Sequence, residues 1–236
     1  MKIKQARDAV RAAKSIAVLT GAGVSAESGI PTFRSNGGYW KTHRFEDLAT
    51  PEAFKRDPKF VWEFYEERRR SMAAAKPNAG HVALAELEWR VPTFTLATQN
   101  IDGLHDAAGS RNVIKLHGDI WVLRCVACGR EREDRSRLEV LPPRCGCGGM
   151  LRPGVVWFGE MLPDGAMTRS TEAVVTADVF LVVGTSARVF PAAGLIPLAV
   201  QSGVTVVEIN PEATDFSSEV NYMLKGPAAE ILPALL

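Results

Sequence analysis

The chain has 236 residues, enough for one large domain or for a domain that carries a smaller inserted module. Lys and Arg number 28 against 27 Asp and Glu, so no net field attracts nucleic acid or an anionic membrane surface. We therefore expect no direct nucleic-acid binding, and any recognition of charge must be local.

The N-terminal segment is basic, and its apolar run at residues 16–19 is too short for a signal-peptide core or a membrane span. Ile3, Ala6, Val10 and Ala13 form a helical stripe that leads into a strand-like segment. This pattern favours a structural first helix over a transit peptide. We expect a cytoplasmic protein with no membrane association.

Five short apolar, β-branched runs each end in a polar or glycine-rich turn, as strands buried on both faces do. Helical patterns lie between some of them, such as Asp164 to Thr176 and Pro191 to Ser202. This alternation predicts an α/β fold with a Rossmann-like parallel sheet, whose ligands gather at the carboxyl ends of the strands. The five runs are residues 16–23, 93–100, 113–118, 179–186 and 204–210.

Two segments interrupt the alternation. Residues 35–85 have the pattern of helices and loops, and residues 119–155 contain four cysteines, many charges and little core material. We interpret both as parts of a smaller domain, made of a helical insertion and a zinc-binding module. The Rossmann-like domain would then consist of residues 1–34, 86–118 and 156–236.

The four cysteines form two close pairs, CVAC with Cys125 and Cys128, and CGC with Cys145 and Cys147. Their spacing is close to that of a zinc ribbon, and a reducing compartment favours metal over disulfides. Four thiolates complete a tetrahedral Zn²⁺ site, so we predict one structural ion with no open position. The second pair is one residue shorter than C-x-x-C, and Gly146 can adopt the backbone conformations that a tighter turn requires.

The segment after the first strand, GAGVSAESGIPTFR, satisfies the dinucleotide pattern G-x-G-x-x-G/A with Gly21, Gly23 and Ala26. Glycines let the backbone approach a pyrophosphate, although a plain strand-to-helix turn is an alternative. A dehydrogenase would continue with a helix, a second strand and an acidic residue about twenty positions later. This chain continues instead with TFRSNGGYWKTHRFEDLATP.

That continuation resembles the sirtuin family of NAD-dependent protein deacylases, and further motifs follow in the family's order over nearly the whole chain. The resemblance implies that the Rossmann-like domain binds NAD as a consumed co-substrate and that the substrates are proteins bearing acyl-lysines. The further motifs are TQNIDGLH at 98–105, LHG at 116–118, VVWFGE at 155–160, GTS at 184–186 and IN at 209–210.

The resemblance makes His117 and Asn100 the catalytic residues. His117 would take a proton from the ribose that bears nicotinamide, a task that suits the ordinary pKa of histidine. Gln99 and Asn100 would contact this ribose, while Ile101 and Asp102 would hold the carboxamide, although polar residues after a strand could equally form a turn. The other cofactor residues implied are Gly21, Ala22, Gly23, Ala26, Thr32, Phe33, Arg34, Tyr39, Trp40, Gly184, Thr185, Ser186, Asn210, Pro211, Glu212 and Ala228.

In sirtuins the acyl-lysine amide oxygen attacks the ribose carbon, and nicotinamide departs. The vicinal hydroxyl, activated by the histidine, then attacks the imidate carbon, which gives free lysine and acyl-ADP-ribose. The resemblance also makes VVWFGE an edge segment for an extended substrate peptide, with Val156, Trp157, Phe158 and Gly159 as binding residues. A hydrophobic core strand is the alternative interpretation of this segment.

Tyr65 and Arg68, in the segment FYEERRR, lie three positions apart and so share one face of a predicted helix. A phenol beside a guanidinium makes a compact receptor for a carboxylate. The class III branch of sirtuins carries Tyr-x-x-Arg here and prefers lysines with succinyl, malonyl or glutaryl groups. The resemblance thus implies this preference with some deacetylation. We interpret the other charged residues, Glu66, Glu67, Arg69 and Arg70, as a solvated helix surface.

The sequence has three alternative functional interpretations. The protein could be a general lysine deacetylase, for which Tyr65 and Arg68 would be incidental. It could be a protein ADP-ribosyltransferase that uses the same NAD site. A zinc-ribbon module that binds nucleic acid or a partner is disfavoured by the balanced charge and the intact motifs.

Overall fold

The computed structural model describes residues 2–32 and 45–236. Four predicted cofactor residues, Phe33, Arg34, Tyr39 and Trp40, lie outside these described residues. Within the two described ranges, we find no helix with the length and apolar character needed to span a membrane.

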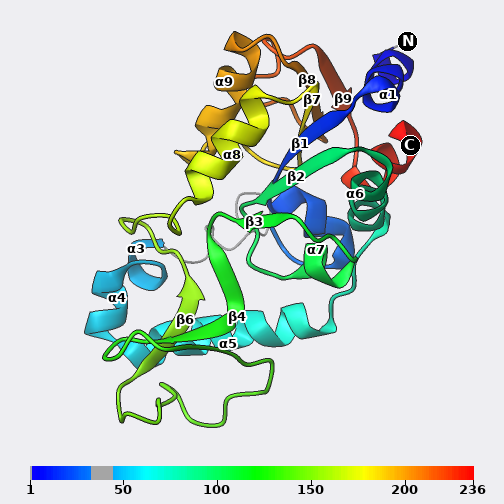
Figure 1. Ribbon diagram of the computed structural model, residues 1–236. Helices are drawn as coiled ribbons and strands as arrows, with labels where there is room; N and C mark the ends of the chain where they lie inside the picture. The colour runs from blue at the N-terminus through cyan, green and yellow to red at the C-terminus, as the bar shows by residue number, and fades with distance from the viewer. Residues whose placement is uncertain (1, 33–44) are drawn as a thin grey trace.

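A six-stranded parallel sheet forms the centre of the larger part, in the order β3-β2-β1-β7-β8-β9 (Figure 1). The chain moves outward from β1 through β2 and β3, and then crosses to β7 on the other side of β1. The carboxyl ends of β1 and β7 therefore form a topological switch point, where ligands of such sheets bind. The strands are β1 Ser15–Thr20, β2 Thr93–Thr98, β3 Val113–Lys115, β7 Val179–Val183, β8 Thr205–Asn210 and β9 Tyr222–Lys225.

Alternate residues of β1 enter separate cores on the two faces of the sheet, as the period of two in a strand requires. Ile16 and Val18 belong to one core, and Ala17 and Leu19 belong to the other. The first core includes residues of α1 Lys2–Ala12, α6 Ala79–Arg90 and α10 Ala228–Ile231, and the second includes residues of α8 Ala166–Val175 and α9 Leu195–Gln201. The predicted α/β fold with a Rossmann-like sheet is thus confirmed, and β9 is one strand that the sequence did not indicate.

The smaller part lies at the end of the molecule opposite the termini (Figure 1). It contains a three-stranded sheet in the order β5-β4-β6, in which β4 runs antiparallel to both neighbours. A third core joins this sheet to the helices, and the Trp62 indole donates a hydrogen bond to the Leu151 carbonyl, at 2.8 Å. Its elements are α3 Phe45–Leu48, α4 Pro51–Arg56, α5 Pro58–Ala74, β4 Gly118–Cys125, β5 Glu131–Glu133 and β6 Leu151–Val155.

The remaining elements are short connections. Three are 3₁₀ helices, η1 Ala22–Ser28, η2 Ala192–Gly194 and η3 Pro233–Leu235, and one is the single-turn helix α7 Leu104–Ala107.

The domain limits stay a prediction. Helix α6 spans the predicted limit between residues 85 and 86, and its buried side chains Ala83, Leu84 and Leu87 pack in the first core of the large sheet.

The charged run on α5 is not a uniform solvated surface, so that prediction is wrong for two of its residues. Arg69 and Glu66 are only 2% and 7% exposed, and they form an ion pair at 3.1 Å. The Arg69 guanidinium also donates to the carbonyls of Ile120, Asp134 and Ser136, at 2.8 to 3.0 Å. It is buried because it satisfies backbone acceptors of the cysteine-bearing segment, whereas Arg70 is exposed as predicted.

Candidate active site

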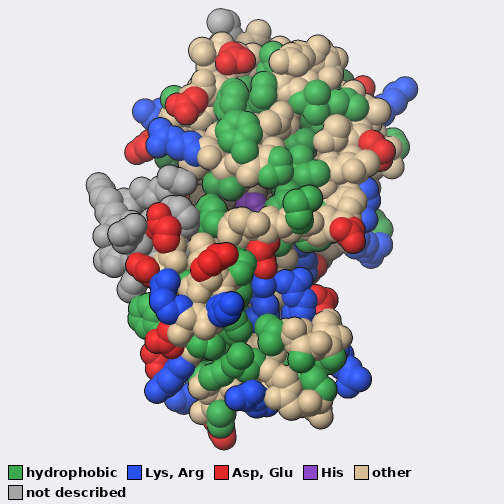
Figure 2. Space-filling model, turned by 90° about the vertical axis from the view of Figure 1, so that its left-hand side faces the viewer, with side chains coloured by type: hydrophobic (Ala, Val, Ile, Leu, Met, Phe, Trp, Pro, Cys, Tyr) green, Lys and Arg blue, Asp and Glu red, His purple; other side chains and the backbone are tan. Residues whose placement is uncertain are grey.

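A cavity of about 1270 Å³ lies between the carboxyl ends of the large sheet and the smaller part. Figure 2 shows hydrophobic side chains gathered around the hollow between these two parts. Most of the predicted site residues within the described chain line this cavity together. They are Gly21, Ala22, Gly23, Ala26, Thr32, Tyr65, Arg68, Gln99, Asn100, Ile101, Asp102, His117, Val156, Trp157, Phe158, Gly159, Gly184, Thr185, Ser186, Asn210, Pro211 and Glu212.

Ala228 does not line the cavity. It is 4% exposed and packs in the first core at the start of α10. Its backbone carbonyl would lie 3.2 Å from a side-chain carbon added at Gly80, so it fits closely against α6. The structure therefore does not bring Ala228 together with the other predicted cofactor residues.

The two glycines of the first loop have a packing role besides any approach to a phosphate. A Cβ atom on Gly23 would lie 2.7 Å from the Gly184 Cα atom, and one on Gly21 would lie 2.8 Å from the Thr185 Cα atom. The Gly23 N–H donates to the Gly184 carbonyl at 2.7 Å. Glycine at both positions thus lets the loops after β1 and β7 touch through their backbones.

Hydrogen bonds donated by polar side chains join the carboxyl ends of β2, β7 and β8. The Gln99 amide, after β2, donates to the Thr185 hydroxyl, after β7, at 2.9 Å. The Asn210 amide, at the end of β8, donates to the Thr185 carbonyl at 2.9 Å. These hydrogen bonds fix the positions of Gln99 and Asn210 relative to Thr185 in the cavity wall.

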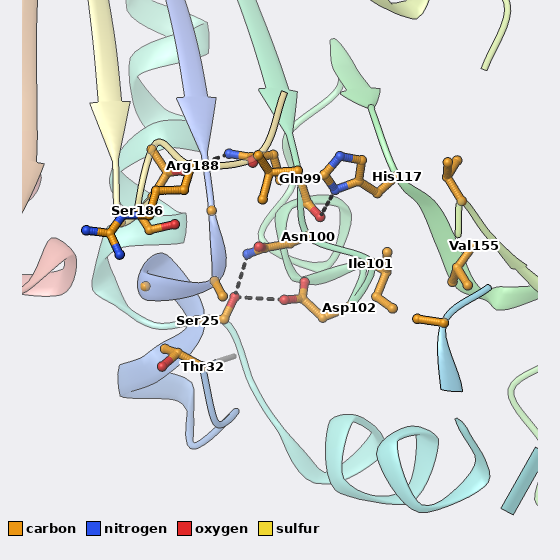
Figure 3. A pocket seen from close by; sticks show the side chains of 18 of the residues that line it. Ser25, Thr32, Gln99, Asn100, Ile101, Asp102, His117, Val155, Ser186 and Arg188 are labelled. Atoms are coloured by element: carbon orange, nitrogen blue, oxygen red, sulfur yellow. Dashed lines mark hydrogen bonds between the residues drawn. The ribbon is translucent and has the colours of Figure 1, made fainter. Parts of the chain in front are cut away.

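Ser25, which is not among the predicted site residues, links two of them (Figure 3). Its hydroxyl donates to the Asp102 carboxylate at 2.8 Å and accepts from the Asn100 amide at 3.1 Å. Burial raises the pKa of Asp102, and the Ser25 and Leu104 hydrogen bonds oppose this rise. The sequence showed only a polar residue inside the glycine loop, whereas its burial, at 1% exposure, and its two partners depend on tertiary packing.

His117 is held through one ring nitrogen. Its Nδ1 donates to the Gln99 carbonyl at 3.0 Å, because a carbonyl can only accept (Figure 3). In the neutral ring, Nε2 then has a free lone pair. Burial lowers the pKa of His117, so the ring is mainly neutral at pH 7 and is suited to accept a proton.

The backbone that follows the His117 side chain is closely packed. Gly118 has a φ of 76°, and a Cβ atom there would lie 2.1 Å from the Gly154 carbonyl oxygen. The His117 carbonyl accepts from the Val156 N–H at 2.9 Å. These contacts place the histidine directly beside the segment that follows β6.

That segment, VVWFGE, leaves the sheet at Val155 and has two kinds of side chain. Trp157 is 3% exposed and belongs to the core of the smaller part, whereas Phe158 is 39% exposed at the cavity. The N–H groups of Val156 and Phe158 already donate to His117 and Ala49. The segment therefore combines a core residue with an exposed wall, and the structure does not make it a free sheet edge along its whole length.

Tyr65 and Arg68 project from α5 into the part of the cavity walled by Trp157. Both are buried, at 3% and 4% exposure. The Trp157 indole N–H donates to the Tyr65 hydroxyl at 2.9 Å. Burial raises the pKa of Tyr65, with an opposing contribution from the Arg68 charge, so the phenol keeps its proton at neutral pH.

The four cysteines form a cluster in which the sulfur atoms all lie within 4.8 Å of one another. Three of the Sγ–Sγ distances are 3.5, 3.5 and 3.9 Å. A tetrahedral Zn²⁺ with Zn–S bonds of about 2.3 Å requires sulfurs about 3.8 Å apart. Cys125, Cys128, Cys145 and Cys147 therefore fit one structural zinc, and the shorter CGC pair does not prevent their convergence.

The comparisons with known proteins agree with this geometry. The Sir2 family profile matches residues 21–191, more than half of the chain. An NAD-dependent protein deacylase from Aquifex aeolicus is 53% identical over 91% of each chain. A Sir2 homologue in complex with NAD is 47% identical, with a TM-score of 0.92 and coverage of 98% of this chain and 91% of that one.

A second solved structure, a Sir2 complex with a p53 peptide and NAD⁺, is 33% identical. Its TM-score is 0.87, and the match covers 99% of this chain and 96% of that chain. The resemblance seen in the motifs thus extends to the whole fold and to relatives of nearly equal length. The chain belongs to the Sir2 family.

Proposed function

We propose that this Sir2-family enzyme, an NAD-dependent protein deacylase, prefers lysines that bear acidic acyl groups such as succinyl or malonyl, and deacetylates more slowly. One observation carries this proposal: Tyr65 and Arg68 are buried in the same cavity as His117. A buried guanidinium that faces a cavity favours an anionic partner, because desolvation strengthens the attraction between the two charges.

The residues beside the large sheet supply the site for NAD. The touching glycine loops and the Gln99, Thr185 and Asn210 network would border it, and Asn100 and Asp102 would stand near the nicotinamide end. His117 Nε2 would take the proton from a ribose hydroxyl. The relatives named NAD-dependent protein deacylases and the Sir2 structures with NAD support this assignment.

The smaller part would bind and recognise the acyl group. Tyr65 offers a hydroxyl proton and Arg68 offers guanidinium protons, which match the two oxygens of a terminal carboxylate. An acetyl group lacks this carboxylate, so it can react without using the pair. This difference supports faster turnover of succinyl-lysine, with acetyl-lysine as a slower substrate.

The test is Arg68→Met, compared with Arg70→Met two positions along the same helix. Each variant is incubated with NAD and matched succinyl-lysine and acetyl-lysine peptides, and both products are followed by mass spectrometry. We expect Arg68→Met to lower kcat/KM for the succinyl peptide by about 100-fold, because a buried carboxylate that loses its partner costs about 3 kcal/mol. The acetyl peptide should lose much less, and Arg70→Met, at an exposed site, should change neither.

An equal loss for both peptides in Arg68→Met would make the acidic preference wrong. It would leave a general deacetylase, for which the Tyr65 and Arg68 pair serves only to support the fold. Circular dichroism and zinc content of the variants show that the comparison is made between folded proteins.

A further inference from the structure

The Tyr65 hydroxyl is held by a neighbour that no motif assigns to acyl recognition. Trp157 donates its indole N–H to the phenol oxygen at 2.9 Å, and both side chains are buried. Among the described residues, this is the hydrogen bond that the structure gives to the Tyr65 hydroxyl. The orientation of the phenol O–H therefore depends on Trp157.

A phenol oxygen that accepts a hydrogen bond from one side must direct its own proton elsewhere. Tyr65 lines the cavity, as does Arg68, whose guanidinium carbon lies 5.8 Å from the centre of the Tyr65 ring. With Trp157 as donor, the phenol proton is left for a group in the cavity. A carboxylate is an acceptor only, so it matches this proton and the guanidinium together.

Trp157 itself is fixed on several sides. The Arg152 guanidinium carbon lies 3.4 Å from its ring centre, and the Phe54 ring centre lies 5.2 Å away. Arg152 forms a two-point ion pair with Glu160, and the Glu160 carboxylate also accepts the Trp157 backbone N–H at 2.8 Å. The indole N–H thus has one direction, which is toward Tyr65.

We propose that Trp157 is a specificity-determining positioning residue: its indole N–H orients the Tyr65 hydroxyl so that the phenol proton points at the carboxylate of an acidic acyl-lysine. This inference rests on the proposed function. Burial raises the pKa of Tyr65, so the phenol keeps the proton that this role requires. Acetyl-lysine has no acceptor at this position and gains nothing from the orientation.

The test replaces Trp157 by benzothienylalanine, in which sulfur stands for the indole N–H and the ring keeps its size, and also by Trp157→Phe. The measured quantity is the ratio of kcat/KM for succinyl-lysine to kcat/KM for acetyl-lysine peptides. General losses from altered packing lower both values and cancel in the ratio. We expect the ratio to fall about fivefold, the effect of one net hydrogen bond of about 1 kcal/mol.

The matched control is Trp62→Phe. Trp62 is buried in the same core and also donates its indole N–H, but to the Leu151 carbonyl instead of Tyr65. This variant should lose stability and keep the ratio. In a Tyr65→Phe background, which has no hydroxyl to orient, the Trp157 replacements should lower the ratio no further.

The outcomes separate the two proposals. If Tyr65→Phe and Arg68→Met leave the ratio unchanged, the acidic preference fails, and the inference fails with it. If those variants lower the ratio but both Trp157 replacements leave it unchanged, only the role of Trp157 is overturned. A further fall in the Tyr65→Phe background would also overturn it, because the effect would not pass through the hydroxyl.

Discussion

Replacing Arg69 by Met should destabilise the smaller part of the molecule far more than its place in a charged run suggests. The guanidinium is buried, forms an ion pair with Glu66 and donates to three backbone carbonyls. Met can fill part of the volume but supplies no donor. The carbonyls of Ile120, Asp134 and Ser136 then lose a partner, and Glu66 keeps the hydrogen bond from the Leu138 N–H, at 3.2 Å.

The expected loss in the free energy of unfolding is about 3–5 kcal/mol, the cost of breaking a buried ion pair by removing one partner. Because the whole stability of a protein is about 5–15 kcal/mol, such a loss is severe. The assay is urea unfolding of the zinc-loaded enzyme, followed by circular dichroism and tryptophan fluorescence. Hydrogen exchange of the Ile120 and Trp121 amides locates the effect on β4.

Arg70→Met is the matched control, since the exposed neighbour should change stability by about 0.5 kcal/mol or less. Adding Glu66→Gln to Arg69→Met should recover part of the loss, because the carboxylate is no longer left charged and unpaired. An Arg69→Met protein that unfolds within about 1 kcal/mol of Arg70→Met would refute the reasoning.

Two further predictions concern histidines. His117→Ala should abolish turnover, while the circular dichroism spectrum and the zinc content stay unchanged. In the unaltered enzyme, kcat/KM should rise with pH through a pKa below 6.5 and then level off, because burial lowers the His117 pKa. Burial also lowers the pKa of His81 to about 4 and that of His105 to about 3, so below pH 6.5 the unfolded chain binds protons that the folded chain excludes. The free energy of unfolding should therefore fall with decreasing pH between 6.5 and 4, by up to about 1.4 kcal/mol per pH unit for each histidine. Thermal unfolding from pH 7 to pH 5 measures this loss, and an unchanged Tm would contradict the burial of His81 and His105 as neutral rings.

The sheet could be predicted from the sequence because its strands are buried on both faces, so each appears as a continuous apolar run. Ile16 to Leu19 is such a run, and the structure divides it between two cores. Strand β9 has only four residues and ends in an exposed lysine, Lys225, so the same signal was too weak. Arg69 could not be predicted as buried, since its partners are carbonyls from a segment more than fifty positions away.

At the site, the motifs indicated residues that touch the cavity but not what holds them. The spacing of Tyr65 and Arg68 predicted that they share one face of a helix. The Trp157 indole that fixes Tyr65 is 92 positions away in the sequence. Ser25 was hidden for the same reason, because its partners Asn100 and Asp102 follow a different strand. Such pairings depend on tertiary packing, which local patterns do not contain.

The division of the cavity wall between separate cores has a consequence for how these enzymes can diverge. Tyr65 and Trp157 pack in the core of the smaller part, whereas the glycine loops follow strands of the large sheet, whose two faces carry the other two cores. A substitution at Tyr65 or Trp157 alters side-chain packing in this core and not in the two cores of the large sheet. If the smaller part recognises the acyl group, as proposed, substitutions there can change which modified lysine is accepted without altering the residues that border the NAD site.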